Sequence, residues 1–214
     1  MFELSKVRYK DIIAIDQLSI KEGKTTCLVG ESGSGKTTLL KLLNHLVDFK
    51  EGTITYQGND LKILDAVLLR RKVILLPQTP VIFPGTIKEN LLIGLMFAKK
   101  ELASDQRLLA ELEKVGLHHK KLDEDASQLS GGEQQRLALI RVILMEPEVL
   151  LLDEPTSALD DETVERITAY IKEYLNSGEK TMVLVTHSKP FARAMGNVIV
   201  TINNGRITAT EEVA

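Results

Sequence analysis

The sequence predicts an α/β fold in which a mostly parallel β-sheet carries a phosphate-binding loop. One observation is the stretch Gly30–Thr37, which has the spacing G-x-x-x-x-G-K-[ST] between a predicted strand and a predicted helix. The other is the alternation of short apolar runs with helical stretches along the chain, which is typical of β-α-β units with right-handed crossovers. In such sheets, ligands bind beyond the carboxyl ends of the strands.

The loop contains the residue types that hold a triphosphate. The predicted strand Thr25–Val29 leads into it, and a helix over Thr37–Leu46 follows. Its glycines let backbone N–H groups turn inward, and the helix N-terminus adds partial positive charge. We expect Lys36 to reach the β- and γ-phosphates and the Thr37 hydroxyl to bind Mg²⁺. The expected triphosphate contacts are Gly30, Glu31, Ser32, Gly33, Ser34, Gly35, Lys36, Thr37 and Thr38.

The residues before the loop are also predicted to form strands, over Phe2–Leu4 and Ile12–Ile20, and another strand signal lies at Gly52–Gly58. Tyr9 lies upstream of the loop, where an aromatic ring could stack on adenine. It is equally well explained as one more aromatic side chain of a strand.

From Thr86 to about Met145 the pattern is helical. The first helix begins at Thr86, a second covers Ser104–Val115, and a third covers Gly131–Met145. The segment after Gln78 has more apolar side chains than a small isolated subdomain needs. These are Phe83, Leu91, Leu92, Leu95, Met96 and Phe97.

Several further strands end in polar residues. The predicted elements are the strand Val73–Leu76, the strand Val149–Leu152, a helix over Glu162–Leu175, the strand Thr181–Val185, and a hairpin of Val198–Val200 with Arg206–Thr208. Gly30, Gln78, Asp153 and His187 follow predicted strands, so we expect them to meet at one site. Asp153 would hold Mg²⁺ through water, and Glu154 would orient a water molecule toward the γ-phosphorus.

The stretch Leu129–Arg136 is the most specific in the chain. Ser130, followed by Gly131 and Gly132 at a helix start, makes a second anion-binding N-terminus. One nucleotide cannot easily use two such N-termini of the same chain, whereas a head-to-tail dimer can supply the second from its partner. The alternative is an ordinary helix cap.

The composition excludes several classes of protein. The 214 residues carry a net charge of −3 without a long basic block, so no nucleic-acid partner is expected. The short basic runs Leu69–Lys72 and His118–Lys121 are interpreted as solvated helix ends. Cys27, the one cysteine, excludes an intramolecular disulfide and is expected to be buried. We find no signal peptide and no apolar run of membrane-spanning length, and we expect a cytoplasmic domain without an added regulatory domain after the hairpin.

These motifs, in this order, resemble the nucleotide-binding subunit of an ATP-binding cassette (ABC) transporter over nearly the whole chain. Gly30–Thr37 matches Walker A, Val149–Asp153 matches Walker B, Leu129–Glu133 matches the signature, and Ser157–Asp160 matches the D-loop. The resemblance implies one ATPase domain over residues 1–214. It would have a P-loop NTPase core, an N-terminal antiparallel β subdomain and an inserted helical subdomain at about 79–145.

The resemblance also implies roles for individual residues. Glu154 is expected to be the catalytic glutamate, acting with Lys36 on bound ATP. Gln78 matches the Q-loop glutamine, which senses Mg²⁺ and the membrane partner. His187 matches the switch histidine, which contacts the γ-phosphate. Two departures are a segment between Tyr9 and Gly23 that is shorter than usual, and Ser188 in place of a common acidic residue.

The resemblance further implies that two subunits enclose two ATP molecules as a homodimer. The partner's Ser130, Gly131, Gly132 and Asp160 would complete each site. Closure would drive an integral-membrane permease near Gln78, which places the subunit peripherally on the inner face of the cell membrane.

Within the family, Gln78–Leu91 and Leu139–Arg141 resemble exporters, in particular the two-component metal-efflux systems of the Fet type. We therefore expect export of a metal ion or small solute. An importer ATPase for amino acids or phosphate and a soluble iron–sulfur-assembly cassette are the alternatives. A cassette that binds ATP without turnover would be expected to lack Glu154, His187 or the signature glycines, so we expect an enzyme.

Overall fold

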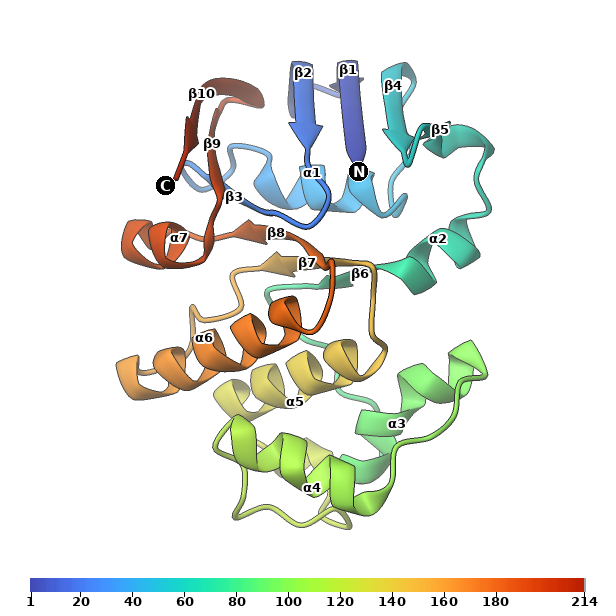
Figure 1. Cartoon of the computed structure of the whole chain (residues 1–214), viewed down its shortest axis with the longest axis vertical. Coiled ribbons are helices and arrows are strands. Elements are labelled where there is room, and N and C mark those ends of the chain that lie inside the picture. Colours follow the sequence, from blue (N-terminus) through green and yellow to red (C-terminus); the bar gives the residue numbers. More distant parts are fainter. Residues whose placement is uncertain (214) are drawn as a thin grey trace.

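The computed structural model describes residues 1–213, in which strands and helices alternate as predicted (Figure 1). The strands are β1 (Phe2–Tyr9), β2 (Ile13–Ile20), β3 (Thr25–Val29), β4 (Glu51–Tyr56), β5 (Asn59–Asp60), β6 (Val73–Leu76), β7 (Val149–Asp153), β8 (Thr181–Val185), β9 (Val198–Asn203) and β10 (Arg206–Glu212). The α-helices are α1 (Lys36–Leu43), α2 (Ala66–Lys72), α3 (Ile87–Ala98), α4 (Asp105–Lys114), α5 (Gly131–Leu144), α6 (Asp161–Asn176) and α7 (Lys189–Met195), and η1 (Leu61–Ile63) and η2 (Ala126–Gln128) are short 3-10 turns.

The larger sheet has the strand order β10-β9-β3-β8-β7-β6, and β9, β3, β8, β7 and β6 run parallel. All residues of β7 and β8 are buried, which explains their continuous apolar sequences. Because β3 lies between β8 and β9, the phosphate-binding loop after β3 is at the centre of the sheet. The expected mostly parallel sheet is confirmed.

A second, antiparallel sheet has the order β2-β1-β4-β5. Helix α1 lies between the two sheets (Figure 1), and Leu39, Leu40, Leu42 and Leu43 are all fully buried there. Such a helix is apolar on more than one face because both sheets cover it. The N-terminal antiparallel sheet therefore agrees with the predicted fold class.

The helices α3, α4 and α5 gather at the end of the molecule opposite the small sheet (Figure 1). Their buried side chains join those beneath β7 and β8 in one continuous core. Thr86 and Ser104 cap α3 and α4, and Ser130 caps α5, as their positions in the sequence predicted. None of the helices within residues 1–213 is both long enough and apolar enough to cross a bilayer.

Some boundaries differ from the prediction. Helix α1 ends at Leu43 rather than Leu46, because His45 adopts a left-handed conformation with φ +55°. Strand β1 continues to Tyr9, well beyond Leu4. The short helix α7 was not predicted, and it begins directly after Ser188, whose hydroxyl accepts a hydrogen bond from the Phe191 N–H.

Candidate functional site

The phosphate-binding loop joins β3 to α1 and can form only with glycine at its first position. Gly30 has φ +148°, and a Cβ placed there would lie 2.0 Å from the backbone oxygen of Ile202 in β9. Any side chain would force the loop away from the sheet. The close approach of two backbones therefore fixes where the loop begins.

Lys36, the first residue of α1, is buried inside the loop. Its Nζ donates hydrogen bonds to the backbone oxygens of Gly30 (2.9 Å) and Glu31 (2.7 Å). Burial lowers the pKa of Lys36, while the carboxylates of Glu154 and Asp153 act in the opposite direction. The loop is thus organised around an ammonium group, which a phosphate would neutralise.

The turn between β9 and β10 supports the loop from the other side. The Gly205 N–H donates to the backbone oxygen of Ser34 (3.0 Å), and the backbone oxygen of Gly205 accepts from the Ala14 N–H (2.8 Å). One glycine of the hairpin therefore links the phosphate-binding loop to the start of β2.

Asp153 ends β7 and is 3% exposed. Its Oδ1 is buried without a hydrogen-bond partner, and burial raises the pKa of this carboxyl, although the Thr37 side chain acts to lower it. An unpartnered carboxylate oxygen beside a hydroxyl suits a hard divalent cation such as Mg²⁺. Residues 1–213 contain no cluster of three or more acidic, histidine or cysteine side chains that could hold a metal.

The residues after β6, β7 and β8 meet at one point. His187 Nε2 lies 2.8 Å from Glu154 Oε1, and Gln78 Nε2 donates to Glu154 Oε2 at 3.4 Å. Glu154 has φ +51°, and its N–H is bonded to the oxygen of Val185 at 3.0 Å. The predicted convergence of side chains at the carboxyl ends of the strands is therefore seen in the structure.

A cavity of about 310 Å³ joins these groups to the loop. Its lining residues are Ile12, Ser32, Gly33, Gly35, Lys36, Thr37, Thr38, Gln78, Glu154 and His187. Tyr9 is not among them, because it lies at the end of β1 and packs against the N-terminal core. The apolar side chain that lines the cavity is instead Ile12, in the turn after β1. The sequence suggested an aromatic residue at this place and did not predict Ile12.

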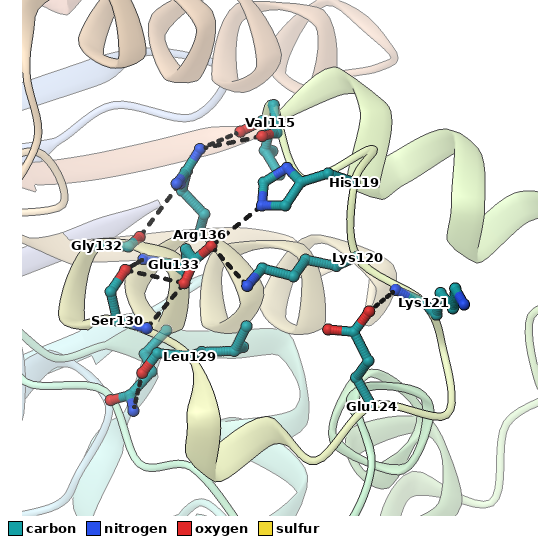
Figure 2. Close-up of polar contacts among 12 residues, drawn as sticks. Val115, His119, Lys120, Lys121, Glu124, Leu129, Ser130, Gly132, Glu133 and Arg136 are labelled. Atoms are coloured by element: carbon teal, nitrogen blue, oxygen red, sulfur yellow. Dashed lines mark hydrogen bonds and ion pairs between the residues drawn. The ribbon is translucent and has the colours of Figure 1, made fainter.

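The signature residues lie on a different surface from this cavity. Figure 2 shows Ser130 at the start of α5, where its hydroxyl accepts from the Glu133 N–H and the Glu133 carboxylate accepts from the Ser130 N–H. Gly131 is open to its surroundings, whereas a Cβ on Gly132 would lie 3.1 Å from the Leu159 side chain.

The D-loop thus packs against the signature. Asp160, predicted to contact a nucleotide, caps α6 in this structure by accepting from the Thr163 N–H and hydroxyl.

A groove of about 480 Å³ runs between α2, β6, α3 and α5. Its charged lining residues are all basic: Arg70, Arg71 and Arg141. Apolar side chains at its edge are strongly exposed, with Phe97 at 71% and Val67 at 58%. Of the six apolar residues that were more than a small subdomain was expected to need, Phe83 and Phe97 line the groove and Met96 is exposed, whereas Leu91, Leu92 and Leu95 belong to the core.

Known proteins are similar to this chain over most of its length. The model of the family described as "ABC transporter" matches residues 14–157. The glutamine transport ATP-binding protein GlnQ of Bacillus subtilis is 37% identical over 214 residues, covering 96% of this chain and 87% of that protein. The lactococcin-A transport/processing ATP-binding protein LcnC of Lactococcus lactis is 38% identical over 208 residues. That match covers 92% of this chain but only 28% of LcnC.

Among solved structures, the ATP-binding cassette MJ0796 is similar over 100% of this chain and 99% of its own. It was determined as a dimer in a post-hydrolysis state bound to ADP and Pi, and its TM-score is 0.87 at 31% identity.

Proposed function

Because this chain belongs to the ABC transporter family, as an ATPase cassette, we propose that two copies of it enclose two ATP molecules and that hydrolysis drives a membrane-embedded partner. The observation that carries the proposal is the meeting of Lys36, Glu154 and His187 at one cavity, while Ser130 begins a helix on another surface. In this proposal, residues 1–214 are one ATPase domain and about 79–145 its helical subdomain.

Glu154 is the proposed general base. Its two oxygens are already held by His187 and Gln78, which fixes the carboxylate at the cavity. The water oxygen forms a bond to the γ-phosphorus, the bond from that phosphorus to the bridging oxygen of ADP breaks, and a water proton passes to Glu154. Because a carboxylate only accepts hydrogen bonds, the contact with Glu154 places a proton of His187 on Nε2, and donating that proton to a γ-phosphate oxygen would replace the bond to Glu154.

The loop supplies binding rather than bond-making chemistry. Lys36 would exchange the Gly30 and Glu31 oxygens for β- and γ-phosphate oxygens, beside backbone N–H groups of residues 31–38. Thr37, Asp153 and the Gln78 amide oxygen would hold Mg²⁺, which when bound neutralises phosphate charge. The unpartnered Oδ1 of Asp153 supports this assignment.

A second copy would complete each site. Ser130, Gly131 and Gly132 do not line the cavity of their own chain, although the exposed start of α5 is suited to an anion. Gly132 packs against the segment before Asp160, so signature and D-loop present one continuous surface to a partner. The dimeric state of the MJ0796 cassette supports the formation of a dimer, and the head-to-tail arrangement is part of the proposal.

The groove beside Phe97 is the proposed contact for the permease. The groove combines exposed apolar side chains at its edge with three arginines. Strand β6 forms part of its wall, and Gln78 lies just beyond the end of that strand. A cross-link between a cysteine at Phe97 and the membrane partner would test this, and the same cysteine at Thr210, exposed on β10 at the opposite edge of the larger sheet from β6, should give none. Such contacts would place the chain peripherally on the inner face of the cell membrane.

Export of a metal ion or small solute is the proposed transport activity, on the resemblance of Gln78–Leu91 to exporters. The relatives include a lactococcin transport/processing protein and an L-cystine import protein, so an amino-acid importer is the alternative. Deleting the gene should raise sensitivity to the exported metal. A loss of amino-acid uptake with unchanged metal sensitivity would favour the importer.

The decisive experiment uses Glu154→Gln with Glu162→Gln, an exposed carboxylate on α6, as the matched control. Glu154→Gln should keep ATP binding, lose hydrolysis by about 10²- to 10⁴-fold, and become a dimer in light scattering only with Mg-ATP. The control should hydrolyse ATP like the parent. Undiminished turnover in Glu154→Gln would remove that residue from its role, and the absence of an ATP-dependent dimer would contradict the composite site.

A further inference from the structure

The glutamate of the signature segment is bound on both of its oxygens. Oε2 of Glu133 accepts from the Ser130 N–H (2.8 Å) and hydroxyl (3.0 Å), as Figure 2 shows. Oε1 lies 3.0 Å from Lys120 Nζ and 3.3 Å from His119 Nε2. Both partners come from the loop between α4 and η2, and the Lys120 side chain is only 19% exposed.

A second capping box in the same chain shows that helix capping does not require this arrangement. At the start of α3, the Glu89 carboxylate accepts from the Thr86 N–H (2.7 Å) and hydroxyl (3.1 Å), matching the bonds of Glu133 to Ser130. Yet Glu89 is exposed and makes no ion pair within residues 1–213. The contacts of Glu133 with Lys120 and His119 are therefore additional to the cap.

The surroundings of Glu133 leave few other groups to neutralise it. Arg136 lies one turn along α5, but its guanidinium donates to the backbone oxygens of Val115 (3.0 Å) and Gly116 (3.4 Å). Burial tends to raise the pKa of Glu133, and bonds from Ser130, Lys120 and His119 outweigh it and lower the pKa to about 2. Glu133 is thus a carboxylate at neutral pH.

This carboxylate lies where the proposed composite site needs the opposite charge. The Ser130 hydroxyl has a single proton, which it donates to Glu133 Oε2 rather than to a phosphate. A γ-phosphate approaching Ser130 would therefore compete for that proton and meet a negative charge next to it. A cation on the far oxygen reduces both effects.

We propose that Lys120, assisted by His119, is a positioning residue that neutralises Glu133 so that Ser130 can bind the γ-phosphate of an ATP held by the partner cassette. The inference rests on the composite site proposed above. Lys120 itself is bonded to the carboxylate and acts through it, without touching the nucleotide.

The test measures the dissociation constant of the ATP-dependent dimer by light scattering, with every variant made in Glu154→Gln. Lys120→Met should weaken dimerisation about tenfold or more, as expected for loss of a close charge partner at an interface. Lys120→Arg should keep dimerisation. Lys120→Met combined with Glu133→Gln should restore it, because the charge that needed neutralising is gone. Lys88→Met is the control, because the Lys88 ammonium also forms an ion pair, with Asp105 at 2.6 Å, in the same group of helices. This variant should leave the dissociation constant of the dimer unchanged.

Each outcome has a definite meaning. The inference is wrong if Lys120→Met dimerises like the parent. It is also wrong if adding Glu133→Gln to Lys120→Met does not restore dimerisation. The monomer's affinity for ATP should be unchanged in all these variants, since the loop at Lys36 is intact. If the Glu154→Gln parent itself does not dimerise with ATP, the composite site fails first and the role of Lys120 fails with it.

Discussion

Replacing Gly205 by alanine should test how firmly the phosphate-binding loop depends on the hairpin β9–β10. Gly205 has φ +73°, and a Cβ there would lie 2.1 Å from the Ile12 backbone oxygen. Gly58 offers the matched control, since it has φ +79° but no atom within 4 Å of the position that a Cβ would take. The two substitutions share a left-handed φ and differ in what the new methyl group meets.

The expected magnitudes follow from these contacts. A left-handed alanine costs about 1 kcal/mol at either site. At Gly205 the hairpin must also move away from Ile12. This movement breaks the backbone hydrogen bonds to Ser34 and Ala14, and each loss costs about 1 kcal/mol. Gly205→Ala should therefore lower the free energy of unfolding by about 3 kcal/mol, and Gly58→Ala by about 1 kcal/mol.

Urea denaturation followed by circular dichroism measures both values. Titration with a fluorescent ATP analogue adds a functional measurement, because loss of the bond to Ser34 should weaken nucleotide binding in Gly205→Ala alone. Equal destabilisation of the two variants would refute the argument, since it would mean that the contact with Ile12 relaxes without cost. Unchanged nucleotide affinity would show that the hairpin does not support the loop.

Three further predictions concern single charges. Lys36→Ala should weaken ATP binding by at least about tenfold in calorimetry, because it removes the only cation inside the described loop, and equal affinity would contradict its assignment. Ser130→Arg should leave ATP binding to the monomer intact while preventing ATP-dependent dimerisation, as judged by light scattering. Glu133→Gln should lower stability at pH 7. The folded pKa of Glu133, about 2, lies below its ordinary 4.5. The difference in unfolding free energy between parent and variant should therefore shrink as the pH falls from about 4.5 to about 2. A difference that stays constant over this range would contradict the prediction.

The strands that carry the site can be predicted because each is a short buried run ending in a polar residue. Gly30, Gln78, Asp153 and His187 are expected together on that basis, and the structure brings Gln78 and His187 within hydrogen-bond distance of Glu154, the residue after Asp153. The phosphate-binding loop is equally clear, since its glycines and lysine occur at a fixed spacing. Sequence patterns succeed where local chemistry and position in a parallel sheet determine the result.

Other features depend on contacts between distant residues. The run His118–Lys121 is predicted to be a solvated helix end, but Lys120 lies in a loop and pairs with Glu133. Ile12 is missed because which side chain of the turn reaches the cavity depends on the fold of β1 and β2. The basic residues Arg70 and Arg71 do lie at a helix end, as predicted.

The position of β3 also affects when the chain can first bind a nucleotide during its synthesis. β3 leaves the ribosome early, yet its two neighbours in the sheet, β8 and β9, are made more than a hundred residues later. Gly30 reaches its final contact only when Ile202 is present, and Ser34 only when Gly205 is present. Such late, non-local pairing delays folding and leaves apolar strands exposed meanwhile. A nascent chain that lacks the β9–β10 hairpin should therefore be unable to hold ATP, so that nucleotide binding marks a molecule whose whole sheet has assembled.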